Sequence, residues 1–91
     1  MKVKELFSDR SNWTQGAFAR DDKNKSIGFD SPLASKWCLA GAIFKCYQKQ
    51  GVKELIRVED RILTSGASGI MSFGDSASYE QIMELVNELD I

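Results

Sequence analysis

Residues 31–51, SPLASKWCLAGAIFKCYQKQG, decide the fold that we predict for this chain. Ser31 followed by Pro32 favours a helix start, because serine accepts a hydrogen bond at the N-cap and proline is preset for the first helical position. Gly51 is typical of a residue that follows a helix end. Between them two neighbouring apolar rows recur at helical spacing, which predicts a central helix over 32–50, buried on most sides. The rows are Leu33, Trp37, Ala40, Phe44 and Tyr47, and Leu39, Ile43 and Cys46.

Small residues lie in the middle of this predicted helix, at Ala40, Gly41 and Ala42. A glycine inside a helix costs about 1 kcal/mol relative to alanine, so Gly41 needs a packing reason. We predict that another backbone segment approaches the helix closely there, and the hairpin around Gly16 and Ala17 is the candidate.

Two more helices are predicted on the C-terminal side of the chain. Residues 52–64 carry apolar side chains at helical spacing, and Glu54 lies three residues before Arg57, where the two can form a supporting ion pair. Ser78, with glutamine three residues later, fits a capping box at the start of a helix over 79–90. The expected inner face of the first of these helices consists of Val52, Leu55, Ile56, Ile62 and Leu63.

Residues 65–77, SGASGIMSFGDSA, are predicted to form a glycine-rich and serine-rich loop between these two helices. Ile70, Met71 and Phe73 are too apolar for a solvated linker, so we expect them to hold the loop against the core. The segment lacks the Gly-Lys-Ser/Thr of a phosphate-binding loop.

The N-terminal third has a different pattern. Residues 3–8 predict a short helical turn, and the segments 14–20 and 26–29 flank the polar turn 21–25, which is typical of a β-hairpin. The predicted fold is therefore mainly α (α+β): one compact domain over 1–91, of three to four helices with a short N-terminal β-hairpin. The expected core is Trp13, Phe18, Trp37, Leu39, Ile43, Phe44, Ile56, Ile62, Leu85 and Val86.

The composition excludes several kinds of chemistry. The chain has no histidine, which removes Ser-His-Asp and Cys-His catalysis and histidine metal sites. Cys38 and Cys46 would lie about 12 Å apart on one helix, too far for a disulfide, and two cysteines are too few for a structural zinc site. Cys38 also falls about two turns into the predicted helix, away from the end where the helix dipole lowers a thiol pKa. We expect no catalytic residue, no metal and no cofactor.

The charges are unevenly distributed although the net charge is only −1. Residues 1–50 carry nine Lys and Arg against five Asp and Glu, a net charge of +4, and residues 51–91 carry three against eight, a net charge of −5. This asymmetry is explained either by solvated helix faces or by docking onto an oppositely charged partner. Neither half is basic enough for strong nucleic-acid binding. The sequence shows no membrane span or signal peptide, so we expect a cytoplasmic protein.

The stretch NWTQGAFARD, residues 12–21, is the candidate binding segment. Gln15, Arg20 and Asp21, together with Asp75, are the residues that we expect to contact a ligand or a partner, because an amide, a guanidinium and two carboxylates can fix a polar group. In the competing interpretation Gln15 satisfies the backbone of the turn, and Arg20 caps a helix C-terminus or pairs with an acidic residue such as Asp75. Trp13 is interpreted as a core residue, with a stacking platform for a base as the alternative.

Four segments together resemble a family of short bacterial and bacteriophage proteins of uncharacterised function. They are W-T-Q-G-A-x-A-R-D in Trp13–Asp21, W-C-x-x-G-A in Trp37–Ala42, F-x-D in Phe73–Asp75 and S-x-E-x-I-x-x-L in Ser78–Leu85. Many family members have a longer N-terminal helix, and often an asparagine at the position of the glycine that precedes Asp75. The resemblance implies a shared fold and a phage or mobile-element setting, and it supplies no activity.

The function that we expect is that of a small, non-enzymatic, phage-encoded interaction protein. Its expected partner is a bacterial protein complex that it binds and modulates, such as a host defence system, and homodimer formation is a further option. The alternative is a small-molecule or nucleotide-binding protein that uses Trp13–Asp21 and the loop 65–77. Binding to nucleic acid or to a membrane is not expected.

Overall fold

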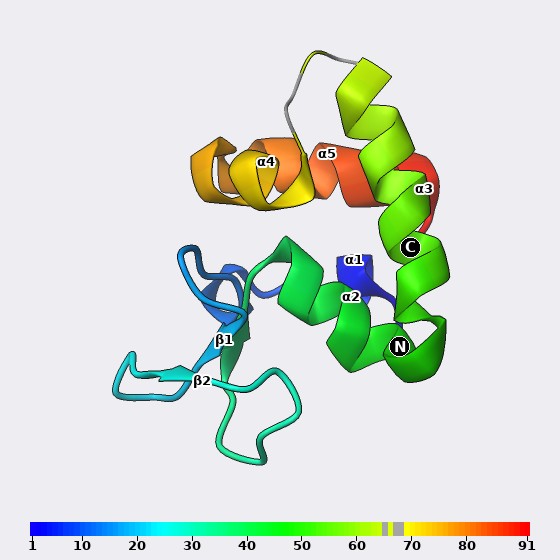
Figure 1. Cartoon of the computed structure of the whole chain (residues 1–91). Helices are drawn as coiled ribbons and strands as arrows, with labels where there is room; N and C mark the ends of the chain where they lie inside the picture. Colours follow the sequence, from blue (N-terminus) through cyan, green and yellow to red (C-terminus); the bar gives the residue numbers. More distant parts are fainter. Residues whose placement is uncertain (65, 67–68) are drawn as a thin grey trace.

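The computed structural model describes residues 1–64, 66 and 69–91, and it confirms a mainly α fold with a small antiparallel sheet (Figure 1). The N-terminal part contains α1 (Val3–Leu6), the 3₁₀ turn η1 (Arg10–Asn12), β1 (Ala19–Arg20), β2 (Ser26–Ile27) and β3 (Lys36–Trp37). The C-terminal part contains α2 (Leu39–Tyr47), the 3₁₀ turn η2 (Gln48–Gln50), α3 (Gly51–Thr64), α4 (Ile70–Ser76) and α5 (Tyr79–Leu89).

The sheet has the strand order β2-β1-β3, with both pairs antiparallel. The β1–β2 hairpin is the one that the sequence predicts. The third strand was not predicted: Ala19 pairs with Trp37, and the Ser35 N–H donates to the Arg20 carbonyl (2.9 Å). Figure 1 shows this sheet beside the N-terminal end of α2.

The predicted start of the central helix at residue 32 is wrong, because α2 begins at Leu39. Ser31 and Pro32 start only a local turn, in which the Ala34 N–H donates to the Ser31 carbonyl (3.1 Å). The chain then pairs with β1 and cannot continue as a helix. Cys38 is the N-cap of α2, and its Sγ accepts a hydrogen bond from the Gly41 N–H (3.3 Å).

The predicted helix end at Gly51 is also wrong. α2 ends at Tyr47, Gln48 adopts a positive φ of 51°, and Gly51 is the first residue of α3. A Cβ at Gly51 would lie 2.8 Å from Cδ1 of Phe44, so glycine is required there for the close approach of α3 to α2.

The close backbone approach predicted at Gly41 is confirmed, although the approaching residue is Phe18 and not Gly16 or Ala17. A Cβ built on Gly41 would lie 1.9 Å from the Phe18 carbonyl oxygen. The Cys38 N–H donates to the same oxygen (3.2 Å). Phe18, which immediately precedes β1, is therefore bonded directly to the N-cap of α2.

Part of the predicted loop 65–77 is a helix, because Ile70–Ser76 form α4. Residues 65, 67 and 68 of that prediction lie outside the described residues. Ile70 is buried and Phe73 packs against the core as predicted, whereas Met71 is exposed. The α5 prediction is confirmed, with the Ser78 capping box in place and Asp90 ending the helix in the left-handed conformation.

The core differs from the predicted one at several positions. Phe18 is 45% exposed and Ile56 is 56% exposed, so both core predictions are wrong, and Trp13 and Phe44 are only partly buried. The fully buried large side chains include residues from both ends of the chain. They are Val3, Phe7, Leu39, Ile43, Val58, Ile62, Ile82, Val86 and Ile91.

The two ends of the chain meet at α1. The Lys4 N–H donates to the Ile91 carbonyl (3.0 Å), and Asp90 forms ion pairs with Lys2 (2.9 Å) and Lys4. These lysines lower the pKa of the Asp90 carboxyl to about 2. None of the helices in the described residues combines the length and the apolar character that a membrane crossing needs.

Candidate functional site

The side chain of Gln15 is bonded to the end of α4. Its Nε2 donates to the carbonyl oxygens of Gly74 (3.0 Å) and Ala77 (2.9 Å). Beside it, the Gly16 N–H donates to Oδ1 of Asp75 (3.1 Å). The last carbonyls of a helix have no partner inside the helix, so Gln15 supplies the C-terminal cap of α4. This geometry matches the interpretation in which Gln15 satisfies backbone groups, although the backbone is that of a distant helix.

Arg20 neither caps a helix nor pairs with Asp75, so that prediction is wrong. Its guanidinium donates to the carbonyl oxygens of Gln15 (3.2 Å) and Asn24 (3.0 Å), and it thereby connects the residues before β1 to the β1–β2 turn. The five donors of an arginine allow it to bridge two carbonyls in this way.

Asp21 belongs to the polar turn between β1 and β2. Its Oδ1 accepts hydrogen bonds from the backbone N–H groups of Lys23 and Lys25, both at 2.9 Å. The structure therefore brings Arg20 and Asp75 to the peptide bond between Gln15 and Gly16, since Arg20 donates to the Gln15 carbonyl and Asp75 accepts from the Gly16 N–H. Asp21 lies apart from them, in the β1–β2 turn. Ligand binding by these four residues stays a prediction.

Trp13 packs between the N-terminal segment and α5. Its ring lies 5.8 Å from the ring of Tyr79, and its backbone bridges to Trp37. The indole N–H is buried with no hydrogen-bond partner among the described residues. Trp13 is partly buried and packs against the core, which agrees with its interpretation as architecture.

Gln15→Ala is expected to lower the free energy of unfolding by about 1–3 kcal/mol, because two partly buried carbonyls at the end of α4 lose their donor. Urea unfolding followed by circular dichroism measures this loss. Gln50→Ala is the matched control, since Gln50 is exposed on η2. Equal stability of the two variants would contradict the capping role.

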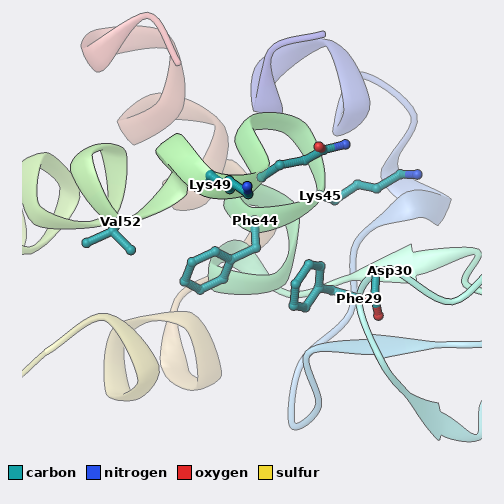
Figure 2. A pocket seen from close by; sticks show the side chains of 7 residues that line it. Phe29, Asp30, Phe44, Lys45, Lys49 and Val52 are labelled. Carbon is teal, nitrogen blue, oxygen red and sulfur yellow. The ribbon is translucent and has the colours of Figure 1, made fainter.

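An open groove lies between the turn that follows β2, the second half of α2 and the start of α3 (Figure 2). Its volume is about 590 Å³, and the rings of Phe29 and Phe44 form its apolar wall, with centroids 5.5 Å apart. Lys45 and Lys49 stand on one border and Asp30 on another. The complete lining is Phe29, Asp30, Phe44, Lys45, Gln48, Lys49 and Val52.

The two lysines of the groove have no acidic partner in the part of the chain that the structure describes. The ion pairs found there use Lys2, Lys4, Arg10, Arg57 and Arg61 instead. Lys45 Nζ lies 5.7 Å from the centroid of the Trp37 ring, a cation–π contact that adds no negative charge beside the lysine. The groove thus offers apolar wall and positive charge together.

The sequence analysis did not identify this groove as a site. Phe44 was assigned to the core and Phe29 to the end of a hairpin segment, and nothing in the linear sequence brings Phe29 to α2. The available signal was the Lys45–Lys49 pair, one helical turn apart at the exposed end of an otherwise apolar helix.

Neither cysteine has the features of a reactive thiol. Burial is the main cause that raises the pKa of both the Cys38 and the Cys46 thiols. The premise that Cys38 lies far from a helix N-terminus is wrong, since it is the N-cap of α2, but desolvation outweighs the hydrogen bonds that it accepts there. Both are free thiols. Within the described residues no three metal-ligating side chains gather in one place.

Comparison of the chain with family models, with curated proteins and with solved structures finds no match. The resemblance to short bacterial and bacteriophage proteins therefore stays a prediction.

Proposed function

We propose that this is a small, non-enzymatic interaction protein whose groove binds an apolar and acidic segment of a bacterial protein complex in the cytoplasm. The observation that carries the proposal is the pairing of the Phe29–Phe44 wall with two lysines that form no ion pair among the described residues and outnumber the single carboxylate of the groove, Asp30. Aromatic side chains contribute much of the binding energy at protein interfaces, and charge at the rim selects the partner.

The resemblance to phage proteins supports a search for this partner among complexes such as host defence systems. A phage-encoded modulator needs a binding surface and no chemistry of its own. The high positive charge of the N-terminal half, which includes both groove lysines, favours an acidic partner over a basic one.

Capture from bacterial lysate by the immobilised protein tests the proposal. The Lys45→Glu/Lys49→Glu variant is expected to lose the captured partner, because it replaces attraction by repulsion at the groove. Lys23→Glu/Lys25→Glu is the control, since it changes the net charge equally at the β1–β2 turn, whose side chains are exposed. Capture that depends equally on both lysine pairs would contradict the groove, and an unmodified protein that captures nothing would contradict the function.

The second candidate function is binding of a small molecule or nucleotide. The groove volume lies in the range of roughly 300–1,000 Å³ that is usual for small-molecule sites. In the Trp13–Asp21 segment, which the sequence suggested for this role, the side chains of Gln15, Arg20 and Asp21 are bonded to backbone groups. A thermal-shift screen with nucleotides separates the two candidates, since a ligand at 100 times its Kd adds about 2.7 kcal/mol to stability. Unchanged melting temperatures would exclude the second candidate.

A further inference from the structure

An apolar row lies on the exposed face of α3. Val52 and Ile56 are each 56% exposed and Leu63 is 52% exposed, whereas Val58 and Ile62 of the same helix are buried. At 100° per residue the three exposed side chains lie within about 40° of one another around the helix axis, and they span about 16 Å along it. The sequence analysis assigned all three to the inner face; the helix is in fact apolar on two sides.

The charges beside this row separate into two groups. Arg57 pairs with Glu54, and Arg61 pairs with Glu88 on α5, so these charges are used inside the molecule. Lys53 and Asp60 are exposed, and neither has an ion-pair partner in the described part of the chain. Both lie about 40–60° to the same side of Ile56, along one flank of the row.

The positions of these two residues are self-complementary under a two-fold axis. The midpoint between Lys53 and Asp60 differs from the midpoint of the apolar row by one residue, about 1.5 Å along the helix. When two copies of α3 lie antiparallel about this midpoint, Lys53 of each copy faces Asp60 of the other, and Val52 lies near Leu63. In a parallel two-fold arrangement the Lys53–Asp60 flanks of the two copies would lie on opposite sides of the interface, so these charges would not pair.

We propose that the protein forms a symmetric homodimer in which α3 packs antiparallel against α3 of a second copy. This inference goes beyond the proposed function and uses a different face: only Val52 is shared with the groove, whose aromatic wall and lysines stay open. Leu63 of the second copy then lies at the Val52 edge of the groove and adds to its apolar wall. Three aliphatic side chains per copy offer less area than the roughly 800 Å² per partner of a standard interface, so the dimer dissociates on dilution.

Sedimentation equilibrium over a range of protein concentrations tests the dimer. The wild-type mass is expected to rise from that of one 10.2 kDa chain to twice that value as concentration increases. Ile56→Glu is expected to raise the dissociation constant at least about tenfold, because it places a charge in the apolar row of both copies. Leu33→Glu is the matched control, since Leu33 is 70% exposed and lies outside α3.

Charge reversal tests the antiparallel register. Lys53→Asp and Asp60→Lys are each expected to weaken the dimer several-fold, and the variant with both changes is expected to restore it, because each copy then again faces an opposite charge. A wild-type protein that remains monomeric at about 1 mM would overturn the proposal. A dimer insensitive to Ile56→Glu, or one that the double change does not restore, would also overturn it.

The test of the dimer and the test of the proposed function give independent results. Lys45→Glu/Lys49→Glu is expected to dimerise like the wild type and to lose partner capture. Failure of the dimer therefore shows in sedimentation, and failure of the proposed function shows in capture.

Discussion

Gly41→Ala is expected to lower the free energy of unfolding by about 3 kcal/mol, at the upper end of the usual range for overpacked cores. The added Cβ would lie 1.9 Å from the Phe18 carbonyl oxygen and 2.8 Å from its carbon, so backbone has to move. The movement would also break the hydrogen bond from the Cys38 N–H to that oxygen. The normal gain of about 1 kcal/mol from replacing a helical glycine by alanine cannot compensate.

Gly74→Ala provides the control for this prediction. Gly74 is also buried inside a helix, but a Cβ there would meet its nearest neighbour, Leu39 Cβ, at 3.9 Å, an ordinary contact. We expect this variant to be as stable as the wild type or more stable by up to about 1 kcal/mol. Urea unfolding of the three proteins, followed by circular dichroism, gives both values. A Gly41→Ala protein as stable as Gly74→Ala would refute the close approach of Phe18.

Phe7→Ala is expected to cost about 3–5 kcal/mol, which is the usual range for truncation of a fully buried phenylalanine. Phe7 has no exposed surface and lies in the core with Val3 and Leu6 of α1. Its backbone carbonyl accepts the hydrogen bond of the Tyr79 hydroxyl, so the cavity opens next to the contact between α1 and α5. A domain of this size has only about 5–10 kcal/mol of stability, and the variant is expected to be largely unfolded at 37 °C.

Phe18→Ala is the control for Phe7→Ala. Phe18 is 45% exposed, so its truncation removes less buried area, and we expect a loss below about 1.5 kcal/mol. Unfolding free energies from urea titration rank the two variants. The sequence pattern, which places Phe18 in the core, predicts the opposite order, and that order would show that the structure assigns these two residues wrongly.

The elements that were predicted well are those with local signals. The α3 and α5 boundaries follow from apolar periodicity and from the Ser78 capping box, and the Glu54–Arg57 ion pair follows from spacing within one helix. The hairpin was also predicted, because its polar turn lies between two short strands in the chain. Each of these signals acts within a few residues.

The elements that were predicted wrongly depend on distant partners. Residues 32–38 have a helical pattern, but β1 offers them ladder hydrogen bonds, and Lys36 and Trp37 form a strand instead. The residues of α4 were assigned to a loop because the segment 65–77 is rich in glycine and serine. The cap that closes the end of α4 comes from Gln15, 59 residues earlier than Gly74. Both outcomes are decided by tertiary contacts that override local propensity.

The candidate site shows the same limit. Gln15, Arg20, Asp21 and Asp75 were chosen because their side chains can bind ligands, and the sequence could not show that backbone groups already occupy them. The groove and the exposed row on α3 were missed because the identity of an apolar residue does not show whether it faces the core or the solvent. Only the packing of α3 against α2 and α4 decides that Val58 is inside and Ile56 outside.

By itself the sequence determined that the domain is mainly α, where α3 and α5 begin and end to within one residue, and that no histidine is present for catalysis. It also determined that Gly41 must meet another backbone. The tertiary structure alone decided which backbone that is, that the central helix begins at Leu39, and which aromatic side chains line a groove rather than fill the core. The physical reason is the separation along the chain over which each interaction acts. Helix capping and apolar periodicity involve residues within one or two turns, whereas strand pairing and side-chain burial depend on residues tens of positions apart.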